Sequence, residues 1–167
     1  EYIAEHGIQI LPITIHLENQ DLVDVRDAQQ TLNFYRKHAG TAGDAGTSPF
    51  TIAQIKDVFL SKLVLDYDYV FCLTIASSRS PIHENATKAS FAILSEYKAI
   101  RAKAGVPGPF SLRVINTQNL FAGQAITAVE AVRMIKANPN PNKIRERLDY
   151  LAENTYGYMV PRDLHYL

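Results

Sequence analysis

The sequence lacks most of the features that mark disulfide-bonded, metal-centred, membrane-spanning and nucleotide-binding proteins. Cys72 is its only cysteine, so no internal disulfide and no cluster of thiolate ligands can form. No apolar run approaches the roughly 20 residues that a membrane helix requires, and neither a glycine-rich phosphate loop nor a secretory leader is visible. We therefore expect a cytoplasmic protein in which Cys72, set within an apolar run, is a buried and inert thiol.

Charge of one sign is not in excess either. Lys plus Arg number 17 and Asp plus Glu number 17. Because phosphate binding needs a basic surface, this balance argues against a nucleic acid partner. Apolar residues make up 47% and charged residues 20% of the chain, as in ordinary globular proteins, and the length suits one domain with its own core.

What the sequence does contain is an alternation of strand-like and helix-like segments. Strands are predicted at 8–18, 68–76, 110–116 and 155–160, a polar loop at 40–50, and helices at 28–39, 52–64, 82–104, 117–137 and 143–154. Such alternation is typical of βαβ units. The near-continuous apolar run at 68–76 suits a central parallel strand that is covered on both faces. The predicted fold is therefore α/β, with a mostly parallel sheet and helices on both faces.

The two ends of the chain carry a separate signal. Glu1 lies in what reads as the end of a helix that Gly7 terminates, since glycine commonly follows the last helical residue. Residues 161–167 read as the start of another helix. We therefore expect residues 1–167 to form a single α/β lobe of a larger protein, truncated at both ends.

Small hydroxyl residues gather where two predicted loops lead into helices. One cluster follows the apolar strand and the other precedes the helix at 52–64: Ser77, Ser78 and Ser80, and Thr47 and Ser48. Ligands of open α/β sheets bind beyond the carboxyl ends of the strands, and helix N-termini attract anions. Thr47 and Ser80 can each donate one hydrogen bond to a carboxylate or phosphate. The simpler alternative, which composition alone favours, is that these hydroxyls only cap helices.

A serine-dependent hydrolase is a further and weaker alternative. It would use Ser80 as nucleophile or His83 as base. The segment "SSRSP" lacks the glycines of a nucleophile elbow, which such enzymes need for a sharp turn at the serine. His83 falls on the first turn of the predicted helix, where a solvated or cap-adjacent histidine is more common than a catalytic base.

In their order along the chain, these features resemble the DegV family of bacterial fatty-acid-binding proteins, and the resemblance covers nearly the whole chain. "TSPFTIAQI" resembles the family segment TSQPSPGEF, and "YDYVFCLTIASSRSPIHENA" resembles a strand followed by SSGLSGTYQSA. "HGIQILPITIHLENQDLVD" resembles an early strand pair with an acidic turn, and "RVINTQNLFAGQAITAVEAVRMI" resembles a strand ending in Asp-Ser and its long helix. "YGYMVPRDLHYL" resembles the approach to a KGGRI motif, which would begin just past Leu167.

The resemblance implies the first lobe of a two-lobed protein that binds a long-chain fatty acid and is not an enzyme. The carboxylate would be held by Thr47 and Ser80, with Ser48, Ser77 and Ser78 beside them, and the acyl chain would lie in an apolar tunnel. Some members present the bound fatty acid to a separate fatty acid kinase, which is the implied protein partner. No metal, no other cofactor and no catalytic residue is expected.

The two loops also depart from the family pattern. Pro49, Arg79, Pro81 and His83 stand where the family usually has glutamine, an apolar residue, glycine and tyrosine. Proline in place of glycine removes one backbone N–H from the anion site. The alternative function is therefore a degenerate DegV-like domain that serves in interaction or regulation without lipid.

Overall fold

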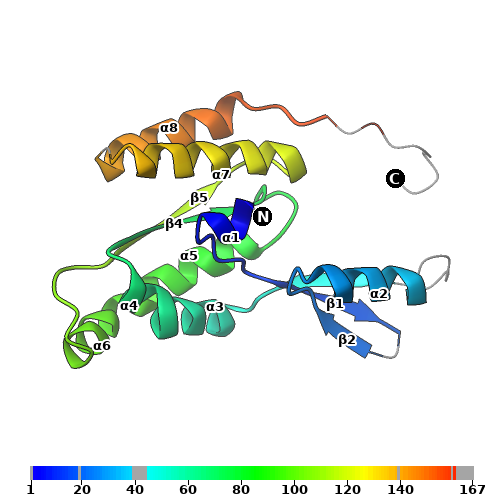
Figure 1. Ribbon diagram of the computed structural model, residues 1–167, viewed down its shortest axis with the longest axis horizontal. Coiled ribbons are helices and arrows are strands. Elements are labelled where there is room, and N and C mark those ends of the chain that lie inside the picture. The colour runs from blue at the N-terminus through cyan, green and yellow to red at the C-terminus, as the bar shows by residue number, and fades with distance from the viewer. Residues whose placement is uncertain (1, 19, 39–44, 139, 159, 161–167) are drawn as a thin grey trace.

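The computed structural model describes residues 2–18, 20–38, 45–138, 140–158 and 160. Its elements follow one another as α1 (Tyr2–Glu5), β1 (Ile13–Leu17), β2 (Gln20–Val23), α2 (Ala28–His38), β3 (Gly46–Pro49), α3 (Ile52–Val58), the π-helical turn η1 (Phe59–Leu63), α4 (Val64–Asp66), β4 (Tyr69–Thr74), α5 (Ile82–Ala92), the 3₁₀ turn η2 (Ile93–Ser95), α6 (Tyr97–Lys103), β5 (Ser111–Asn116), α7 (Phe121–Lys136) and α8 (Pro141–Asn154). Figure 1 shows their arrangement.

A parallel pair of strands, β4 and β5, lies between two layers of helices. The register runs from Tyr69 opposite Ser111 to Thr74 opposite Asn116. Helices α7 and α8 cover one side of the pair and α5 covers the other (Figure 1). The apolar run of β4 is thus covered on both faces, as predicted, and the observed bounds of both strands agree with the predicted 68–76 and 110–116 within two residues.

A second sheet is small and antiparallel. Strand β1 pairs with β2 on one side and with β3 on the other. The α/β class is confirmed, but one mostly parallel sheet is not, because the described strands form a parallel pair and an antiparallel trio. The predicted loop at 40–50 contains β3. The segment "GTSP" has no apolar alternation, and its partner β1 lies far away in the sequence, so the local sequence gives no strand signal. Residues 39–44 of that region lie outside the described part.

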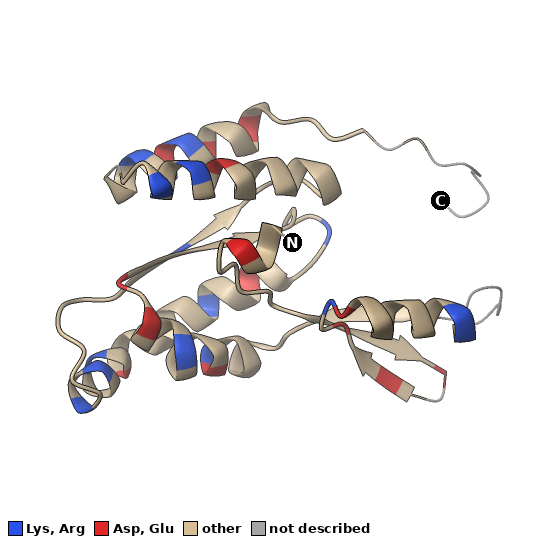
Figure 2. Ribbon diagram, in the orientation of Figure 1, with Lys and Arg blue, Asp and Glu red and all other residues tan. Residues whose placement is uncertain are grey.

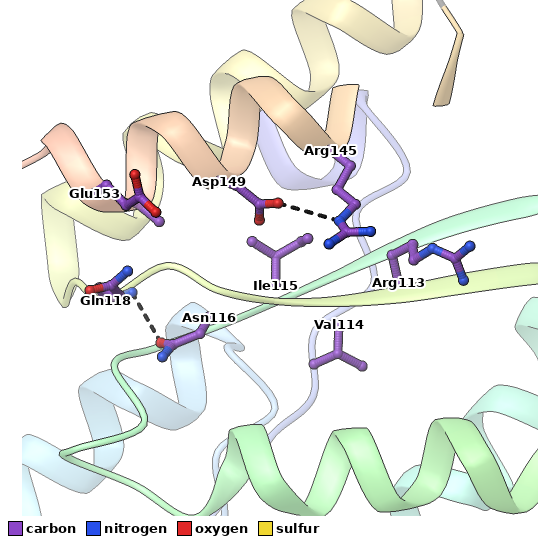
Figure 3. Close-up of a pocket in the computed structure, with 9 residues that line it drawn as sticks. Arg113, Val114, Ile115, Asn116, Gln118, Arg145, Asp149 and Glu153 are labelled. Carbon is purple, nitrogen blue, oxygen red and sulfur yellow. Dashed lines mark hydrogen bonds and ion pairs between the residues drawn. The ribbon is translucent and has the colours of Figure 1, made fainter. Parts of the chain in front are cut away.

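The core consists of two hydrophobic clusters, one on each side of the parallel pair. The larger joins α3, η1, α5 and β4, and its most buried members are Ile55, Phe59, Val64, Ala86, Ala89 and Ile93. The smaller joins β5, α7 and α8 through Ile115, Ala131, Ile144 and Leu148. Because side chains alternate along a strand, Ile115 points to α8 while Val114 points to the opposite layer (Figure 3).

Two predicted helix starts are confirmed by their capping bonds. Asp27 Oδ1 accepts from the backbone N–H of Gln30 at 2.7 Å. Thr51 Oγ1 accepts from the N–H of Gln54, and the Gln54 side chain accepts from the N–H of Thr51. This reciprocal pattern is the capping box, so both helix starts are determined by local sequence.

Three other predictions differ from the structure. The helix predicted at 82–104 is interrupted by η2, although the apolar periodicity continues through that turn. The helix predicted at 117–137 begins at Phe121, because Thr117 is buried and its hydroxyl donates to the carbonyl of Thr74 instead. Residues 155–158 form no strand, and the predicted helix start at 161–167 lies outside the described residues.

Arg101, in α6, is a buried charged side chain with several hydrogen-bond partners. It is 2% exposed, and its guanidinium donates to the carbonyls of Val64, Tyr67, Pro107 and Gly108 at 2.7–3.1 Å. It also pairs with Asp68, whose side chain is 81% exposed, so water screens that ion pair. The carbonyl bonds therefore account for most of the contribution of Arg101, which joins α6 to the segments that precede β4 and β5.

Replacing Arg101 by methionine should lower the free energy of unfolding by about 3 kcal/mol or more, because four carbonyls lose their donor. Urea denaturation followed by circular dichroism measures this loss. Lys103→Met on the same helix is the matched control, since Lys103 is exposed, and it should change stability by less than about 0.5 kcal/mol. Equal losses in the two variants would contradict the assignment.

Cys72 is buried in the larger cluster, as predicted, and burial raises the pKa of its thiol from 9.0 to about 12. The unfolded chain therefore releases this proton at lower pH than the native chain does. Stability from the protonated thiol is fully present below pH 9.0 and is lost as pH rises toward about 12, since a state that binds fewer protons is favoured at high pH.

Cys72→Ala should reduce the loss of stability that accompanies a rise in pH above 9.0, the ordinary thiol pKa. Melting temperatures of both proteins across this range provide the measurement. In the native wild type, an aromatic disulfide reagent near neutral pH should modify Cys72 only as fast as the protein unfolds. Rapid modification in native buffer would contradict the assignment of a buried, inert thiol.

Candidate functional site

The serine cluster follows β4, beside the carboxyl end of β5. Asn116, the last residue of β5, binds the turn: its Oδ1 accepts from the N–H of Ser77 at 3.2 Å and its Nδ2 donates to Ser77 Oγ at 2.9 Å. Asn116 Oδ1 also accepts from the N–H of Gln118 (Figure 3). Ser77 is therefore held by two bonds to the neighbouring strand, while its own hydroxyl hydrogen is not used by either bond.

Ser80 is placed where α5 begins. Its Oγ accepts from the N–H of Ile82 at 3.2 Å, which satisfies one of the free donors of the helix start. The hydroxyl hydrogen of Ser80 is left available to donate. Ser78 is exposed, and no hydrogen bond of its side chain is found within the described residues. The capping alternative thus holds in part for Ser80, but capping uses only the oxygen and not the hydrogen.

His83 contacts Thr74 rather than Ser80. Its Nδ1 lies 3.1 Å from Thr74 Oγ1, and that hydroxyl, 2% exposed, also donates to the carbonyl of Ile115 at 3.3 Å. His83 is on the first turn of α5, as predicted. Because the imidazole is bonded to a buried threonine, the hydroxyl–imidazole pair of the hydrolase alternative is not formed at Ser80.

Thr47 and Ser48 are adjacent in β3 and project to opposite faces of the small sheet. Thr47 is opposite Ile15, and Ser48 is opposite Thr14. Side chains of directly paired residues share a face, so Thr47 lies on the apolar face of the sheet and Ser48 lies on the polar face. One ligand above a single face would therefore meet only one of these two side chains.

Thr47 also presents its backbone at the open edge of the sheet. The bond from Asp24 N–H to the Ile13 carbonyl shows that the backbone groups of residues 13, 15 and 17 in β1 point toward β2, so residues 14 and 16 bond to β3. By the alternation of antiparallel ladders, the N–H and C=O of Thr47 then point away from β1. Within the described residues nothing pairs with them, and the Thr47 side chain is exposed.

Among the described residues, one side chain connects the two predicted loops. Asn85, in the first turns of α5, donates from Nδ2 to the carbonyl of Phe50 at 3.0 Å. Phe50 directly follows β3, and Asn85 lies five residues beyond Ser80. The sequence predicts these loops at one rim of the fold but does not identify Asn85, whose only signal is a polar residue on the buried side of a helix.

Asn119 organises the loop between β5 and α7. It is 6% exposed, and its Nδ2 donates to the carbonyls of Thr117 and Thr155. Its own backbone carbonyl accepts from the N–H of Ala76, so the loops after β4 and β5 are joined here. Gly123 allows this arrangement, because a Cβ at that position would lie 2.7 Å from Asn119 Cγ.

Two hollows of the surface involve none of the predicted hydroxyl residues. The larger, about 540 Å³, lies between β5 and α8 and is lined mainly by polar groups (Figure 3), including Arg113, Asn116, Arg145, Asp149 and Glu153. The smaller, about 370 Å³, lies between α7 and α8. Basic and acidic residues are intermixed along these two helices (Figure 2).

Between those helices, hydrogen bonds from Arg133 and Arg147 hold the pKa of Glu130 at about 2. Arg147 lies in α8 and Glu130 in α7, so their bond joins the two helices.

Within the described part of the chain, no group of three or more potential metal ligands is present. None of the described helices is both long and apolar enough to cross a bilayer.

Comparison with known proteins supports the resemblance over its whole extent. A model of the family described as "Uncharacterised protein, DegV family" matches residues 1–167. The chain belongs to the DegV family. A DegV domain-containing protein of Xanthomonas axonopodis pv. citri is 54% identical over 168 residues, and one of Xanthomonas campestris pv. campestris is 53% identical. Each match covers 100% of this chain but 54% of the relative, so the chain spans about half their length.

Solved DegV proteins share the fold at low sequence identity. A DegV lipid-binding protein of Thermotoga maritima matches with a TM-score of 0.74 at 21% identity, covering 92% of this chain and 49% of that one. A stearic-acid-binding protein of Eubacterium ventriosum gives 0.71 at 21% identity, covering 89% and 47%. The Streptococcus pneumoniae fatty acid kinase B3 protein, loaded with linoleic acid, gives 0.68 at 17%, covering 86% and 45%.

Each of the three solved neighbours is described by the lipid or fatty acid that it binds or carries. The predicted roles of Thr47, Ser48, Ser77, Ser78 and Ser80 in binding remain predictions.

Gly123→Ala should lower the free energy of unfolding by about 1–3 kcal/mol, because the added methyl group overlaps Asn119 and must displace it. Gly157→Ala is the matched control, since a Cβ there would meet the same Asn119 side chain at an ordinary 3.4 Å. Chemical denaturation of both variants tests this. A Gly157→Ala variant as unstable as Gly123→Ala would mean that crowding of Asn119 is not the cause.

Proposed function

We propose that this chain binds a long-chain fatty acid, with the carboxylate held between the end of β3 and the start of α5. Membership of the DegV family supports this function, as do the lipid and fatty-acid ligands of the solved neighbours. The observation in this chain that carries the proposal is the bond from Asn85 to the carbonyl of Phe50. It ties together the segments that carry Thr47 and Ser80.

The donors available there suit a carboxylate. Ser80 accepts from Ile82 and so has its hydroxyl hydrogen free, and Thr47 offers both its Oγ1 hydroxyl and an outward backbone N–H. Carboxylates accept up to four hydrogen bonds and donate none, and the N-terminal end of α5 adds partial positive charge. We assign Thr47 and Ser80 as the principal ligands, with Ser77 and Ser78 beside them. Ser48 is next to Thr47 in β3, but its side chain lies on the opposite face of the sheet.

The acyl chain would supply most of the affinity. Burying a dozen methylene groups at about 0.8 kcal/mol each exceeds the roughly 1.5–3 kcal/mol expected of each hydrogen bond to a charged group. On the face of the small sheet that carries Thr47, the neighbouring residues Ile13 and Ile15 are apolar. We propose that the acyl chain passes over this face into an apolar tunnel, so that the hydroxyls set orientation and the tunnel sets affinity.

In the complete protein, we propose a carrier role without catalysis of its own. The bound fatty acid would be presented to a separate fatty acid kinase, in line with the naming of the S. pneumoniae neighbour. A second lobe would complete the enclosure of the acyl chain. A DegV-like interaction domain without lipid is the competing function, and Arg79, exposed in the serine turn, is compatible with both.

Lipid extracted from the purified and then denatured chain distinguishes these functions. Mass spectrometry should find saturated or monounsaturated fatty acid at close to one molecule per protein. Delipidated protein should then regain added oleate in native mass spectrometry. Absence of both co-purified and added fatty acid would favour the interaction domain.

Thr47→Ala and Ser80→Ala should each weaken oleate binding by about tenfold, because each removes one hydrogen bond to a charged group. Competition with a fluorescent fatty acid measures the dissociation constants. Ser90→Ala is the matched control: Ser90 also lies in α5, but its hydroxyl donates to the Thr87 carbonyl of the same helix. A tenfold loss in this control, or none in either test variant, would refute the assigned ligands.

A further inference from the structure

The polar face of the small sheet carries a carboxylate, an imidazole and a hydroxyl in series. Asp21 Oδ1 lies 2.8 Å from His16 Nδ1, and His16 Nε2 lies 2.7 Å from Ser48 Oγ. The three residues come from β2, β1 and β3 respectively. Thr47, on the opposite face, does not take part, so this series is separate from the proposed carboxylate contact.

Strand register brings the three side chains together. His16 is directly opposite Asp21 in a pair without backbone bonds between its members, where side chains approach most closely. Ser48 is diagonal to His16, because the residue directly opposite on β3 is Gly46. Glycine adds no side chain at that point, so no side chain of β3 stands directly opposite His16.

With Asp21 ionised and the ring of His16 neutral, the two bonds fit one tautomer of the imidazole. An ionised Asp21 can only accept, so His16 must donate from Nδ1. In the neutral ring Nε2 is then an acceptor, and Ser48 donates its hydroxyl hydrogen to it. This is the same use of the two nitrogens that activates a serine in acyl-transfer enzymes, where a carboxylate orients the imidazole and the imidazole takes the serine proton.

We propose that Ser48 is an acyl-acceptor site that reacts with activated acyl donors such as aryl esters or acyl phosphates. Ser48 Oγ attacks the acyl carbon, a new ester bond forms, and the bond to the leaving group breaks. His16 Nε2 takes the hydroxyl proton and releases it to the leaving group or to water. The product is Ser48 carrying one acyl ester, and no oxidant, reductant or metal is required.

The surroundings limit the reaction to donors with good leaving groups. The side chains of His16 and Asp21 are 44% and 66% exposed, so water competes for their hydrogen bonds and weakens the activation. Modification of Ser48 in a single turnover is therefore expected, rather than rapid hydrolysis.

Covalent labelling of the delipidated full chain tests this site. A fluorophosphonate probe forms a bond from phosphorus to a nucleophilic serine and releases fluoride, and p-nitrophenyl butyrate delivers a butyryl group. Both should add one label per chain, and peptide mapping should place it on Ser48. Denatured chain should not react, because the series exists only when the three strands are paired.

Variants define the role of each member. Ser48→Ala should abolish the label, and His16→Gln should slow labelling by roughly 10- to 100-fold, at the lower end of general-base effects. Asp21→Asn should slow it less, and Ser90→Ala should leave it unchanged. Circular dichroism establishes that each variant is folded; if His16→Gln is not, mapping of the wild-type label still decides.

Three outcomes would overturn the proposal. These are no labelling of the native wild type, a label on another residue, and equal labelling rates in the wild type and a folded His16→Gln variant. The last would show that the imidazole holds Ser48 only as a cross-strand contact. None of these results depends on fatty-acid binding, because both reagents have short chains and the protein is free of lipid.

Discussion

Parallel pairing of β4 with β5 is the constraint on which the rest of the structure depends. It brings the carboxyl ends of both strands to one edge, where the turn after β4 and the loop after β5 can bond to each other. Asn116 then holds Ser77, and the Asn119 carbonyl holds the N–H of Ala76. The start of α5 follows from that turn, so the position of Ser80 depends on pairing with a strand that comes later in the chain. The bond from Asn85 to the carbonyl of Phe50 then positions the end of β3 relative to α5.

Local signals can be interpreted correctly from the sequence, whereas non-local ones cannot. The caps at Asp27 and Thr51 and the burial of Cys72 depend on a few neighbouring residues, and the structure confirms all three. The sequence predicts a loop at β3 because "GTSP" has no apolar alternation and forms a strand only through its pairing with β1. The orientation of a strand pair is likewise absent from periodicity. Alternating strands and helices therefore predict one mostly parallel sheet where two small sheets form.

The residues of the candidate site also fall into those that the sequence can indicate and those that it cannot. Hydroxyl clusters next to helix starts are visible in the sequence, so Thr47 and Ser80 can be selected from it alone. Asn85 cannot, since its partner is a backbone carbonyl that any residue at position 50 would provide. The series of Asp21, His16 and Ser48 also cannot be predicted from the sequence, although His16 and Asp21 flank a short polar turn. A hairpin register centred on that turn pairs these two residues, but Ser48 becomes their neighbour only through the third strand.

Two adjacent residues of β3, Thr47 and Ser48, lie on opposite faces of the small sheet and so have different chemical surroundings. Thr47 shares its face with Ile15, which suits a ligand with an acidic end and an apolar chain, whereas Ser48 shares its face with His16 and lies opposite Thr14. A shift of the β3 register by one residue would exchange these environments, placing a threonine beside the imidazole and a serine on the apolar face. Both environments therefore depend on the pairing of a four-residue strand. The bond between Ser48 and His16 and the bond between Asn85 and Phe50 both hold the chain just after Thr47, one within the sheet and one from α5. Both bonds therefore favour the observed register of β3, in which Thr47 lies beside Ile15 and Ser48 lies beside His16.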